Sequence, residues 1–320
     1  MQTLLLTRSE VAQLLDPMAL LPELRKAFEN YSRERTGPAQ KVRALLPAPG
    51  NAHILVPGLA PGIPAYSVKV NAKYPNERPA IRGILHLHDL QTGTLLALMD
   101  ATYITAARTG LTGVLATDLL ARKDARSVAI IGAGVQGEFH LRYLALLRSL
   151  QRASVYDIVP ERAAAFAVRM SSELRFPVVA HESLQVAVKD ADIIITATWA
   201  EKSFLIPEMA KKGTHLTTVG PDEPGKCEID ASLIKQSLFV CDDRELAVQI
   251  GAIGGAGLGP EAIHAELGEV LAGTKLGRTH PEQITIFGSV GLPFQDLVAA
   301  WQVYRAAQEK NIGRRLDFLD

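Results

Sequence analysis

Cysteines, long apolar runs and an excess of charge of either sign are all lacking in this sequence of 320 residues. Its 2 cysteines, Cys227 and Cys241, are too few for a disulfide scaffold, so we expect reduced thiols and a cytoplasmic location. The segment from Met1 to Arg8 has no basic region of the kind that opens a signal peptide. No apolar run reaches the roughly 20 residues that span a membrane. The sequence therefore predicts neither a secreted nor a membrane-embedded protein.

The charges are balanced, with 34 Lys and Arg residues against 34 Asp and Glu residues. A chain without net charge has no overall field that attracts nucleic acid or an anionic membrane, so we expect neither as a partner. Hydrophobic residues make up 48% of the chain and charged residues 21%, as in globular proteins. A chain of this length is expected to form two domains, each with its own hydrophobic core.

The first third of the chain combines a helical pattern with several strand patterns. Apolar residues recur with a helical period over 17–35. Apolar and polar residues then alternate over 41–45, 66–71 and 81–88, which predicts half-buried strands of an antiparallel sheet. We assign residues 1–115 to an α+β domain with a mostly antiparallel sheet.

From Ser127 onward, short apolar runs alternate with helical stretches. This alternation predicts a Rossmann domain, a doubly wound parallel sheet with helices on both faces, which we assign to residues 116–292. A helix over 101–121 is expected to connect the two domains. A last helix follows Pro293, and we expect residues 293–320 to return to the first domain.

A glycine-rich turn, Gly132-Ala133-Gly134-Val135-Gln136-Gly137, lies between an apolar strand and a helix. In the dinucleotide-binding form of this motif, the first glycine permits the tight turn and the second lets the backbone approach the pyrophosphate. The third lets the helix pack closely on the sheet, and the phosphates face the unpaired N–H groups of the helix N-terminus. The alternative is a glycine-rich turn without a cofactor. The strand and the helix around the turn favour a dinucleotide site.

Asp157 ends the next apolar run, about 20 residues after Gly137. A carboxylate at this position hydrogen-bonds the adenosine ribose hydroxyls and repels the 2′-phosphate of NADP(H). The sequence therefore favours NAD(H) over NADP(H). Arg162 follows closely enough to leave NADP(H) open as the alternative.

Charged residues at strand ends and on strand faces are the candidates for chemistry. Asp222 follows the apolar run 215–219, and ligands of an open parallel sheet bind beyond the carboxyl ends of its strands. Several cations with one acid suit an amino or imino acid, because the cations hold the carboxylate while the acid exchanges a proton with the nitrogen. The first domain offers these cations on polar strand faces and on the connecting helix: Arg43, Lys69, Arg82 and Arg108.

Each of these residues also has a structural alternative. Asp222 could be a turn residue before Pro224, Lys69 and Arg43 could be solvated faces of the sheet, and Arg108 could form a structural ion pair. The sequence alone leaves these alternatives open.

Histidines and cysteines give no further candidate. His86 and His88 share one strand face, but no third ligand is evident, so a surface pair is favoured over a zinc site and no metal is expected. Cys227 is expected to be a buried thiol, because no partner that would activate it as a nucleophile is identifiable.

Several stretches match the motifs of a known family. They are Ser67-Val68-Lys69-Val70-Asn71, Leu98-Met99-Asp100 with Ile104-Thr105-Ala106-Ala107-Arg108-Thr109, the run 128–137, Gly220 with Asp222 and the runs 224–226 and 228–230, and the runs 264–270 and 288–291. On these motifs the chain resembles the ornithine cyclodeaminase/mu-crystallin family over nearly its whole length.

The resemblance implies a homodimer joined through the first domain, which also binds the substrate. It implies that Lys69, Arg43 and Arg108 hold the substrate carboxylate while Asp222 handles the proton on the reacting nitrogen. The positions that match those lining the cofactor in the family are Thr109, Asp157, Thr198, Lys226, Ser289 and Val290.

Members of this family perform different reactions that share hydride transfer between an α-amine and its imine. We expect an NAD(H)-dependent imine reductase or amino-acid dehydrogenase for a small α-amino acid, of the Δ1-pyrroline-2-carboxylate reductase, ketimine reductase or alanine dehydrogenase type. The alternatives are an ornithine cyclodeaminase that releases ammonia, and a crystallin-like protein that binds NAD(P)H without catalysis. Both Lys69 and Asp222 are present, which speaks against a pure binder.

Two departures from the family bear on the substrate. Ornithine cyclodeaminases carry a Glu just before the proline of the strand that His53-Ile54-Leu55-Val56-Pro57 matches here, and this chain has no acid there. Arg82 stands where relatives usually have an uncharged residue, on the face that we assign to the site. We therefore expect Arg82 to disfavour diamino acids and to favour a second anionic or carbonyl group on the substrate.

Overall fold

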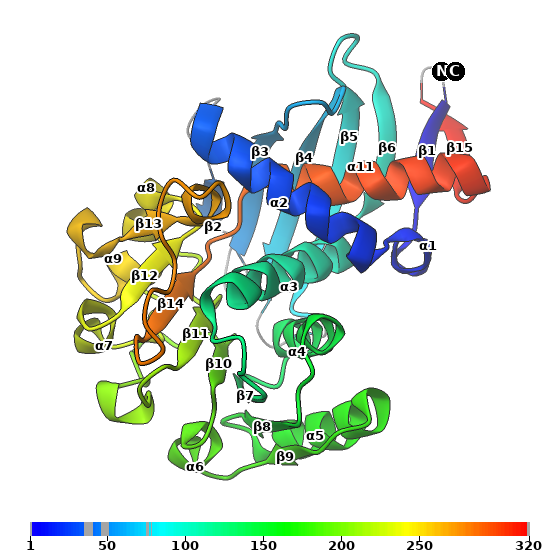
Figure 1. The fold of residues 1–320 in the computed structure, drawn as a ribbon. Helices are drawn as coiled ribbons and strands as arrows, with labels where there is room; N and C mark the ends of the chain where they lie inside the picture. Colours follow the sequence, from blue (N-terminus) through cyan, green and yellow to red (C-terminus); the bar gives the residue numbers. More distant parts are fainter. Residues whose placement is uncertain (1, 35–40, 46–50, 75–76, 78, 319–320) are drawn as a thin grey trace. The chain divides into compact units, whose positions relative to one another are not determined.

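The computed structural model describes residues 2–34, 41–45, 51–74, 77 and 79–318, with side chains for all of them except 41–45 and 51–56. The chain divides into two compact units (Figure 1). The first comprises residues 1–108 and 292–320, and the second comprises residues 109–291. The division falls inside helix α3 (Ala101–Leu120), ahead of the predicted boundary at 115/116.

The first unit contains a seven-stranded sheet in the order β15-β1-β6-β5-β4-β3-β2. Its strands are β1 (Gln2–Leu6), β2 (Lys41–Leu45), β3 (Asn51–Gly58), β4 (Ala65–Lys73), β5 (Ile81–Asp89), β6 (Leu95–Asp100) and β15 (Arg314–Asp317). Among the described strands, neighbours are antiparallel except β1 and β6, which run parallel. The predicted mostly antiparallel sheet is confirmed, and β1 and β15, which we did not predict, extend it.

Helices cover one face of this sheet. Besides the first part of α3, they are α1 (Arg8–Leu14), α2 (Pro17–Glu34) and α11 (Pro293–Lys310). Helix α11 packs on β3, β4 and β5, and α2 packs on α11 (Figure 1). Phe294 of α11 anchors this contact, with its ring centroid 5.0 Å from that of Phe28 and 5.1 Å from that of Tyr31.

The face of β4 that α11 covers is polar, which reverses the usual arrangement of a half-buried strand. Ser67, Lys69 and Asn71 are buried on this face, whereas Val70 on the opposite face is 39% exposed. Burying polar side chains is costly unless they are paired or serve a ligand. This face is therefore where a site in the first unit is expected.

The second unit contains an eight-stranded sheet in the order β13-β12-β14-β11-β10-β7-β8-β9, in which all described pairs are parallel. Its strands are β7 (Ser127–Ile131), β8 (Arg152–Tyr156), β9 (Val178–Ala180), β10 (Ile193–Thr196), β11 (His215–Thr218), β12 (Leu238–Cys241), β13 (Ala265–Glu266) and β14 (Thr285–Gly288). The strand order reverses between β7 and β10, and such a switch point is where open parallel sheets bind ligands. The predicted Rossmann architecture is confirmed.

Helices connect the strands of this sheet. They are α4 (Val135–Leu147), α5 (Pro160–Leu174), α6 (Leu184–Val188), α7 (Ala231–Lys235), α8 (Arg244–Gln249), α9 (Ala252–Gly255) and α10 (Leu267–Leu271), with 3-10 turns η1 (Pro207–Met209) and η2 (Pro260–Ala262). None of the helices formed by the described residues has the length and apolarity needed to cross a membrane.

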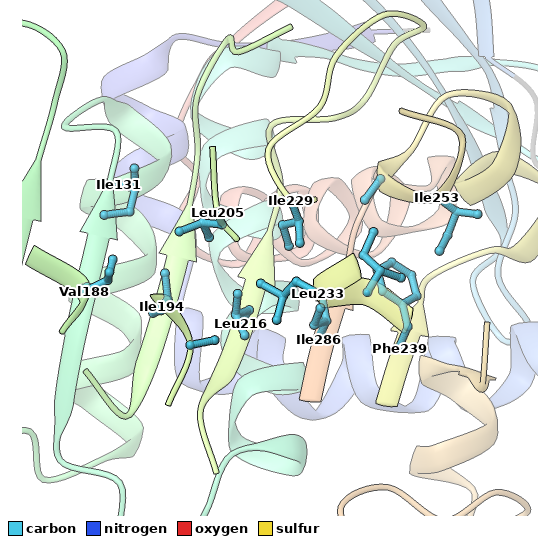
Figure 2. Packing of buried hydrophobic residues seen from close by; sticks show 14 of the residues in the cluster. Ile131, Val188, Ile194, Leu205, Leu216, Ile229, Leu233, Phe239, Ile253 and Ile286 are labelled. Atoms are coloured by element: carbon cyan, nitrogen blue, oxygen red, sulfur yellow. The ribbon is translucent and has the colours of Figure 1, made fainter. Parts of the chain in front are cut away.

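One face of the parallel sheet carries an apolar core (Figure 2). Neighbouring strands each contribute a large side chain that is at most 2% exposed, namely Ile131, Ile194, Leu216, Ile286 and Phe239. Each such side chain stabilises the fold by about 1.5–3 kcal/mol when it leaves water. The resulting rigid sheet fixes the loops that follow the strands, where the candidate residues lie.

Candidate active site

The glycine-rich turn has the backbone geometry that the sequence predicts. Gly132, directly after β7, has a φ of 104°, and a Cβ atom there would lie 2.5 Å from the carbonyl oxygen of Ala197. Both conditions exclude any other residue. The N–H group of Gly132 donates to the carbonyl oxygen of Tyr156 at 2.9 Å, which ties the turn to the end of β8.

Gly134 and Gly137 prepare the N-terminus of α4 for a ligand. Gly134 is the N-cap of α4, no side chain caps this end, and a Cβ atom at Gly134 would meet nothing within 4 Å. At Gly137 a Cβ atom would lie 2.4 Å from the carbonyl oxygen of Gly132, so glycine is needed for the helix to approach the strand. Exposed backbone at an uncapped helix N-terminus is the environment that an anionic phosphate requires.

Asp157 is held in place at the end of β8. One carboxylate oxygen accepts a hydrogen bond from the N–H of Ala133 at 2.9 Å and the other from the N–H of Val159 at 3.0 Å. These bonds fix the carboxylate beside the glycine-rich turn, in the position predicted for a ribose ligand.

Glu228 joins the ends of two neighbouring strands, a role that the sequence analysis missed. Its buried carboxylate accepts hydrogen bonds from the hydroxyl groups of Thr196 and Thr218, both at 2.6 Å, and from the N–H of Gly220 at 3.2 Å. The second oxygen accepts both the N–H and the hydroxyl of Thr198 at 2.7 Å. The predicted cofactor residue Thr198 is thus positioned by Glu228.

Asp222 lies in the loop after β11, as predicted, and forms an ion pair there. Its Oδ1 atom is 2.9 Å from Nζ of Lys226, and its side chain is 27% exposed. Nζ of Lys226 also lies 2.8 Å from Oε1 of Glu223 and 4.2 Å from the ring centroid of Trp199. Burial lowers the pKa of Lys226, but the charges of Asp222 and Glu223 outweigh it and raise this pKa above its usual value. Two predicted residues, Asp222 and Lys226, are therefore in contact.

The predicted cofactor residues Ser289 and Val290 follow β14 and are held by Asp242, a second residue that the sequence analysis missed. One carboxylate oxygen of buried Asp242 accepts the Ser289 hydroxyl at 2.9 Å, the Val290 N–H at 2.9 Å and the Gly291 N–H at 2.8 Å. A carboxylate that accepts several bonds at one point fixes the conformation of this loop.

Lys69 and Arg108 come together in the first unit around a third missed residue, Asp296. Nζ of Lys69 in β4 lies 2.7 Å from Oδ2 of Asp296 in α11 and donates to the Thr105 hydroxyl at 3.0 Å. Nε of Arg108 in α3 donates to Oδ1 of Asp296 at 3.0 Å, and its Nη1 donates to Oε1 of Gln295 at 2.6 Å. Burial alone would raise the pKa of Asp296, but Arg108 and Lys69 lower it below its usual value.

Arg43 and Thr109 are placed by the structure only in part. Arg43 lies in β2 in register with His53 of β3 and, through it, with Asn71 of β4. Its side chain lies outside the described residues, so its role stays a prediction. Thr109 follows Arg108 in α3 and is half-buried.

The position of Arg82 differs from the prediction that places it on the face of the site. It lies in β5 opposite Ala72, whereas Lys69 lies opposite Leu85. Because side chains alternate between the two faces along a strand, Arg82 and Lys69 are on opposite faces of the sheet. Arg82 forms an exposed ion pair with Glu77, with 2.9 Å between Nη2 and Oε2. The prediction that Arg82 shares the face of Lys69 is wrong, and we do not include it in the site.

The histidines and cysteines considered as metal ligands or nucleophiles make packing contacts or are buried. The ring of His88 stacks on Tyr66 with 4.9 Å between centroids, and that of His86 lies 6.3 Å from His88. Cys227 and Cys241 are free and buried, and burial raises the pKa of both thiols. Within the described part of the chain, no group of three or more His, Cys, Asp or Glu residues is arranged to hold a metal ion.

The missed residues left no clear signal in the sequence. Asp296 lies near the start of a helix, where the helix dipole favours acidic residues, so its position gives no sign of a role in the site. Asp242 follows an apolar strand, where a turn residue is common. Glu228 belongs to a matched family motif, but its pattern does not reveal that its hydrogen-bond partners are threonines on two other strands.

Comparison with known proteins gives the family and its relatives. The model of the ornithine cyclodeaminase/mu-crystallin family matches residues 1–311. Delta(1)-pyrroline-2-carboxylate reductase of Bacillus cereus is 32% identical over 98% of this chain and 100% of its own length.

Two solved structures are similar over nearly the whole chain. An archaeal alanine dehydrogenase dimer with bound NAD is 32% identical, covers 100% of both chains and superposes with a TM-score of 0.93. The Delta(1)-pyrroline-2-carboxylate reductase of Thermococcus litoralis, in complex with NADH and L-proline, is 32% identical and covers 98% of this chain and 100% of its own, with a TM-score of 0.90. The chain belongs to the ornithine cyclodeaminase/mu-crystallin family.

Proposed function

We propose that this protein is an NAD(H)-dependent oxidoreductase that interconverts a small α-amino acid and its imine. The observation that carries the proposal is the convergence of two buried cations, Lys69 and Arg108, on the polar face of β4, in a chain that also has an open dinucleotide turn. Relatives named as imine reductases and amino-acid dehydrogenases, two of them with bound dinucleotide, support it.

The second unit fits NAD(H). The pyrophosphate would lie at Gly134, where the backbone is open, and at the uncapped N-terminus of α4. Asp157 would accept hydrogen bonds from the adenosine ribose, and its charge disfavours a 2′-phosphate. The ordered loops of Thr198 and of Ser289 and Val290 would line the rest of the cofactor. When bound, NAD(H) supplies or accepts the hydride.

The first unit supplies the carboxylate recognition. Lys69 and Arg108 are fixed and charged, and a substrate carboxylate would satisfy the remaining donor capacity of Arg108 by charge-assisted hydrogen bonds. Arg43 is proposed as a third cation on the basis of the family motif. A carboxylate held by positioned cations orients the neighbouring α-carbon for hydride transfer.

The proton is assigned to Asp222. Its carboxylate is partly exposed, and the ion pair with Lys226 keeps it oriented in the loop after β11. In the direction of imine reduction, Asp222 or a water that it orients would protonate the nitrogen. In the direction of amine oxidation, it would accept the proton. A positioned acid or base of this kind contributes about 10²–10⁴-fold to the rate.

A reductase or dehydrogenase is favoured over a cyclodeaminase. Loss of ammonia from ornithine needs an acid that binds the distal ammonium, and the run from His53 to Pro57 has none. By analogy with the dimeric relative, we also propose that the protein is a homodimer joined through the first unit. The paucity of cysteines supports a cytoplasmic location.

The test is an assay of NADH consumption with Δ1-pyrroline-2-carboxylate, and with pyruvate plus ammonia. Turnover of either substrate is expected, and NADPH should support it less well than NADH. A second assay, with ornithine and catalytic NAD, measures ammonia and proline. Production of both without net NADH consumption would identify a cyclodeaminase, and binding of NADH without turnover of any substrate would leave only the crystallin-like alternative.

The role of Asp222 is tested by Asp222→Asn, which keeps the shape but cannot exchange the proton. We expect kcat/KM to fall about a hundredfold or more while the Kd of NADH changes little. The control is Asp230→Asn in the same segment, because Asp230 caps α7 and Asn caps a helix as well as Asp does. Full activity of Asp222→Asn would refute the assignment.

A further inference from the structure

The start of α11 holds a buried carboxylate that both predicted substrate-binding cations share. Asp296 is 1% exposed, and its two oxygens lie 2.7 Å from Nζ of Lys69 and 3.0 Å from Nε of Arg108. The three residues come from β4, α3 and α11. No motif that we recognised in the sequence includes Asp296.

A purely structural reason for this cluster is weak. Burying three charges costs several kcal/mol per ion, and apolar side chains of similar volume often give equal or higher stability. A fold that needed only to attach α11 to β4 could use the apolar contacts that the rest of α11 makes. The cluster therefore indicates a function for the two cations, and Asp296 is what keeps both in place.

The neighbouring Gln295 extends the same arrangement. Its Oε1 accepts Nη1 of Arg108 at 2.6 Å while Asp296 accepts Nε of Arg108, so two of the three guanidinium nitrogens are fixed. The third, Nη2, makes no hydrogen bond within the described part of the chain, so its N–H groups remain for a ligand. Because the guanidinium group is planar and rigid, fixing two nitrogens also sets the direction of the third.

The charges of the cluster also fit the ligand. Asp296 supplies one negative charge against the two positive charges of Lys69 and Arg108, so these three side chains keep an excess of positive charge. A substrate carboxylate would offset this excess, which reduces the cost of closing water out of the site. Without Asp296 the two cations would repel each other and separate.

We propose that Asp296 is the positioning residue of the carboxylate site: it touches no substrate, but it fixes Lys69 and Arg108 at the separation and orientation that one substrate carboxylate needs. This inference rests on the proposed function of Lys69 and Arg108. It adds a residue on which the geometry of the reaction depends.

The test is Asp296→Asn, which keeps the size of the side chain and removes its charge. With the cations no longer held together, the substrate carboxylate binds off-centre, and we expect kcat for Δ1-pyrroline-2-carboxylate to fall about a hundredfold. KM should rise by less than about threefold, because the gain in positive charge favours any carboxylate. For the same reason the inhibition constant of acetate should decrease. The Kd of NADH should be unchanged.

The control variant is Gln302→Leu, in the same helix. Gln302 is buried. Its Nε2 donates to the carbonyl oxygen of Asp16 at 3.0 Å, and its Oε1 accepts the N–H of Asp16 at 3.2 Å. Its loss should lower the melting temperature of the protein while kcat and KM stay at wild-type values. If Asp296→Asn behaves like this control, with kcat within about threefold of the wild type, the proposal is overturned.

A second variant covers the case in which Asp296→Asn does not fold. Asp296→Glu keeps the charge that the buried cations need but moves the carboxylate by one methylene. We expect it to fold and to show a kcat at least about tenfold lower, with KM little changed. Wild-type kinetics of a folded Asp296→Glu would overturn the proposal. If the wild-type protein itself reduces no imino acid, the proposed function fails instead, so the two failures are distinguishable.

Discussion

His140 in α4 shows how burial sets the charge state of a single residue. Its side chain is fully buried, its Nδ1 atom lies 2.7 Å from the carbonyl oxygen of Gln136, and Nε2 has no hydrogen-bond partner within the described residues. A Cβ atom at Gly113 would lie 2.3 Å from Nε2, so glycine there makes room for the ring. Burial lowers the pKa of His140 to about 4, so the ring is neutral near pH 7.

The stability of the protein should therefore fall as the pH falls below the usual pKa of histidine. In the unfolded chain His140 takes up a proton near pH 6.5, whereas in the folded chain it does so only near about pH 4. Between these values the unfolded state binds more protons, so acid favours unfolding by up to roughly 3 kcal/mol at this residue. Above pH 6.5 both states are neutral and the effect vanishes.

Urea unfolding at several pH values of the wild type and of His140→Gln checks this. The variant should lose part of the decrease in the free energy of unfolding between about pH 6.5 and pH 4. Some decrease should remain, because burial also lowers the pKa of His215 well below its usual value. An unchanged pH dependence in His140→Gln would show that His140 is not neutral and buried in solution.

At the scale of a secondary-structure element, strand β10 has a carboxylate contact at each end. Before its first residue, Asp192 accepts the N–H groups of Arg126 and Ser127 at 3.0 and 3.1 Å and pairs with Arg122 at 2.7 Å. After its last residue, Thr198 bonds to Glu228. In a parallel sheet only the carboxyl ends of the strands face the ligand, so the two carboxylates should differ in their effect on function.

The matched variants are Asp192→Asn and Glu228→Gln. Asp192→Asn should cost about 1–3 kcal/mol of stability, because it weakens charge-assisted hydrogen bonds, and should leave kcat and the Kd of NADH unchanged. Glu228→Gln replaces one of the two acceptor oxygens by an NH2 group, which can only donate. Because Thr198 and Gly220 bond to different oxygens of Glu228, the variant cannot accept hydrogen bonds from both. We expect it to weaken NADH binding about tenfold. Fluorescence titration measures the Kd of NADH for both variants. Equal affinities would contradict the expectation that only the carboxylate at the carboxyl end of β10 affects cofactor binding.

The strands were more predictable than the way in which they pair. Alternation over 66–71 and 81–88 is a local property, and both strands form. The face that each residue occupies depends on the register between β4 and β5, and a shift by one residue moves every side chain to the other face. The sequence of the connecting segment does not reveal this register, and Arg82 was assigned to the wrong face for this reason.

The site was predictable where its residues follow a local rule. Gly132, Gly134 and Asp157 occur at fixed positions relative to strands and a helix, so their places could be predicted from spacing. Asp296 acts through partners that are far away in the sequence, and Glu228 binds the distant Thr196 and Thr198 as well as the nearer Thr218 and Gly220. The complete sets of contacts form only after α11 packs on β4 and after β10 and β11 pair, so residue spacing does not reveal them.

At the scale of the whole molecule, the face of the antiparallel sheet opposite α11 carries exposed apolar side chains beside Arg82, His86 and His88. Val70 and Ile84 are paired across β4 and β5 and are 39% and 51% exposed. Val68 lies on the same face opposite His86, which in turn lies opposite Leu98 of β6. Exposed apolar side chains on a sheet face are typical of an interaction surface, and the proposed homodimer would bury Val70 and Ile84 against a second copy of the chain.

Ile84→Lys tests this surface without disturbing the fold, because the side chain of Ile84 points away from α11 and is half-exposed. A lysine there would place a charge from each copy in the apolar interface of a two-fold dimer, and burying unpaired charges opposes association. Light scattering coupled to size-exclusion chromatography should show a dimer for the wild type and a monomer for Ile84→Lys. The control is Val168→Lys on α5, where Val168 is 74% exposed in the second unit, and it should remain dimeric.

A monomeric wild type would refute the homodimer, whereas a dimeric Ile84→Lys would place the interface on another surface. Because Lys69 lies on the opposite face of the same strand, a monomer that keeps NADH binding but loses turnover would further show that dimerisation holds β4 in its active conformation.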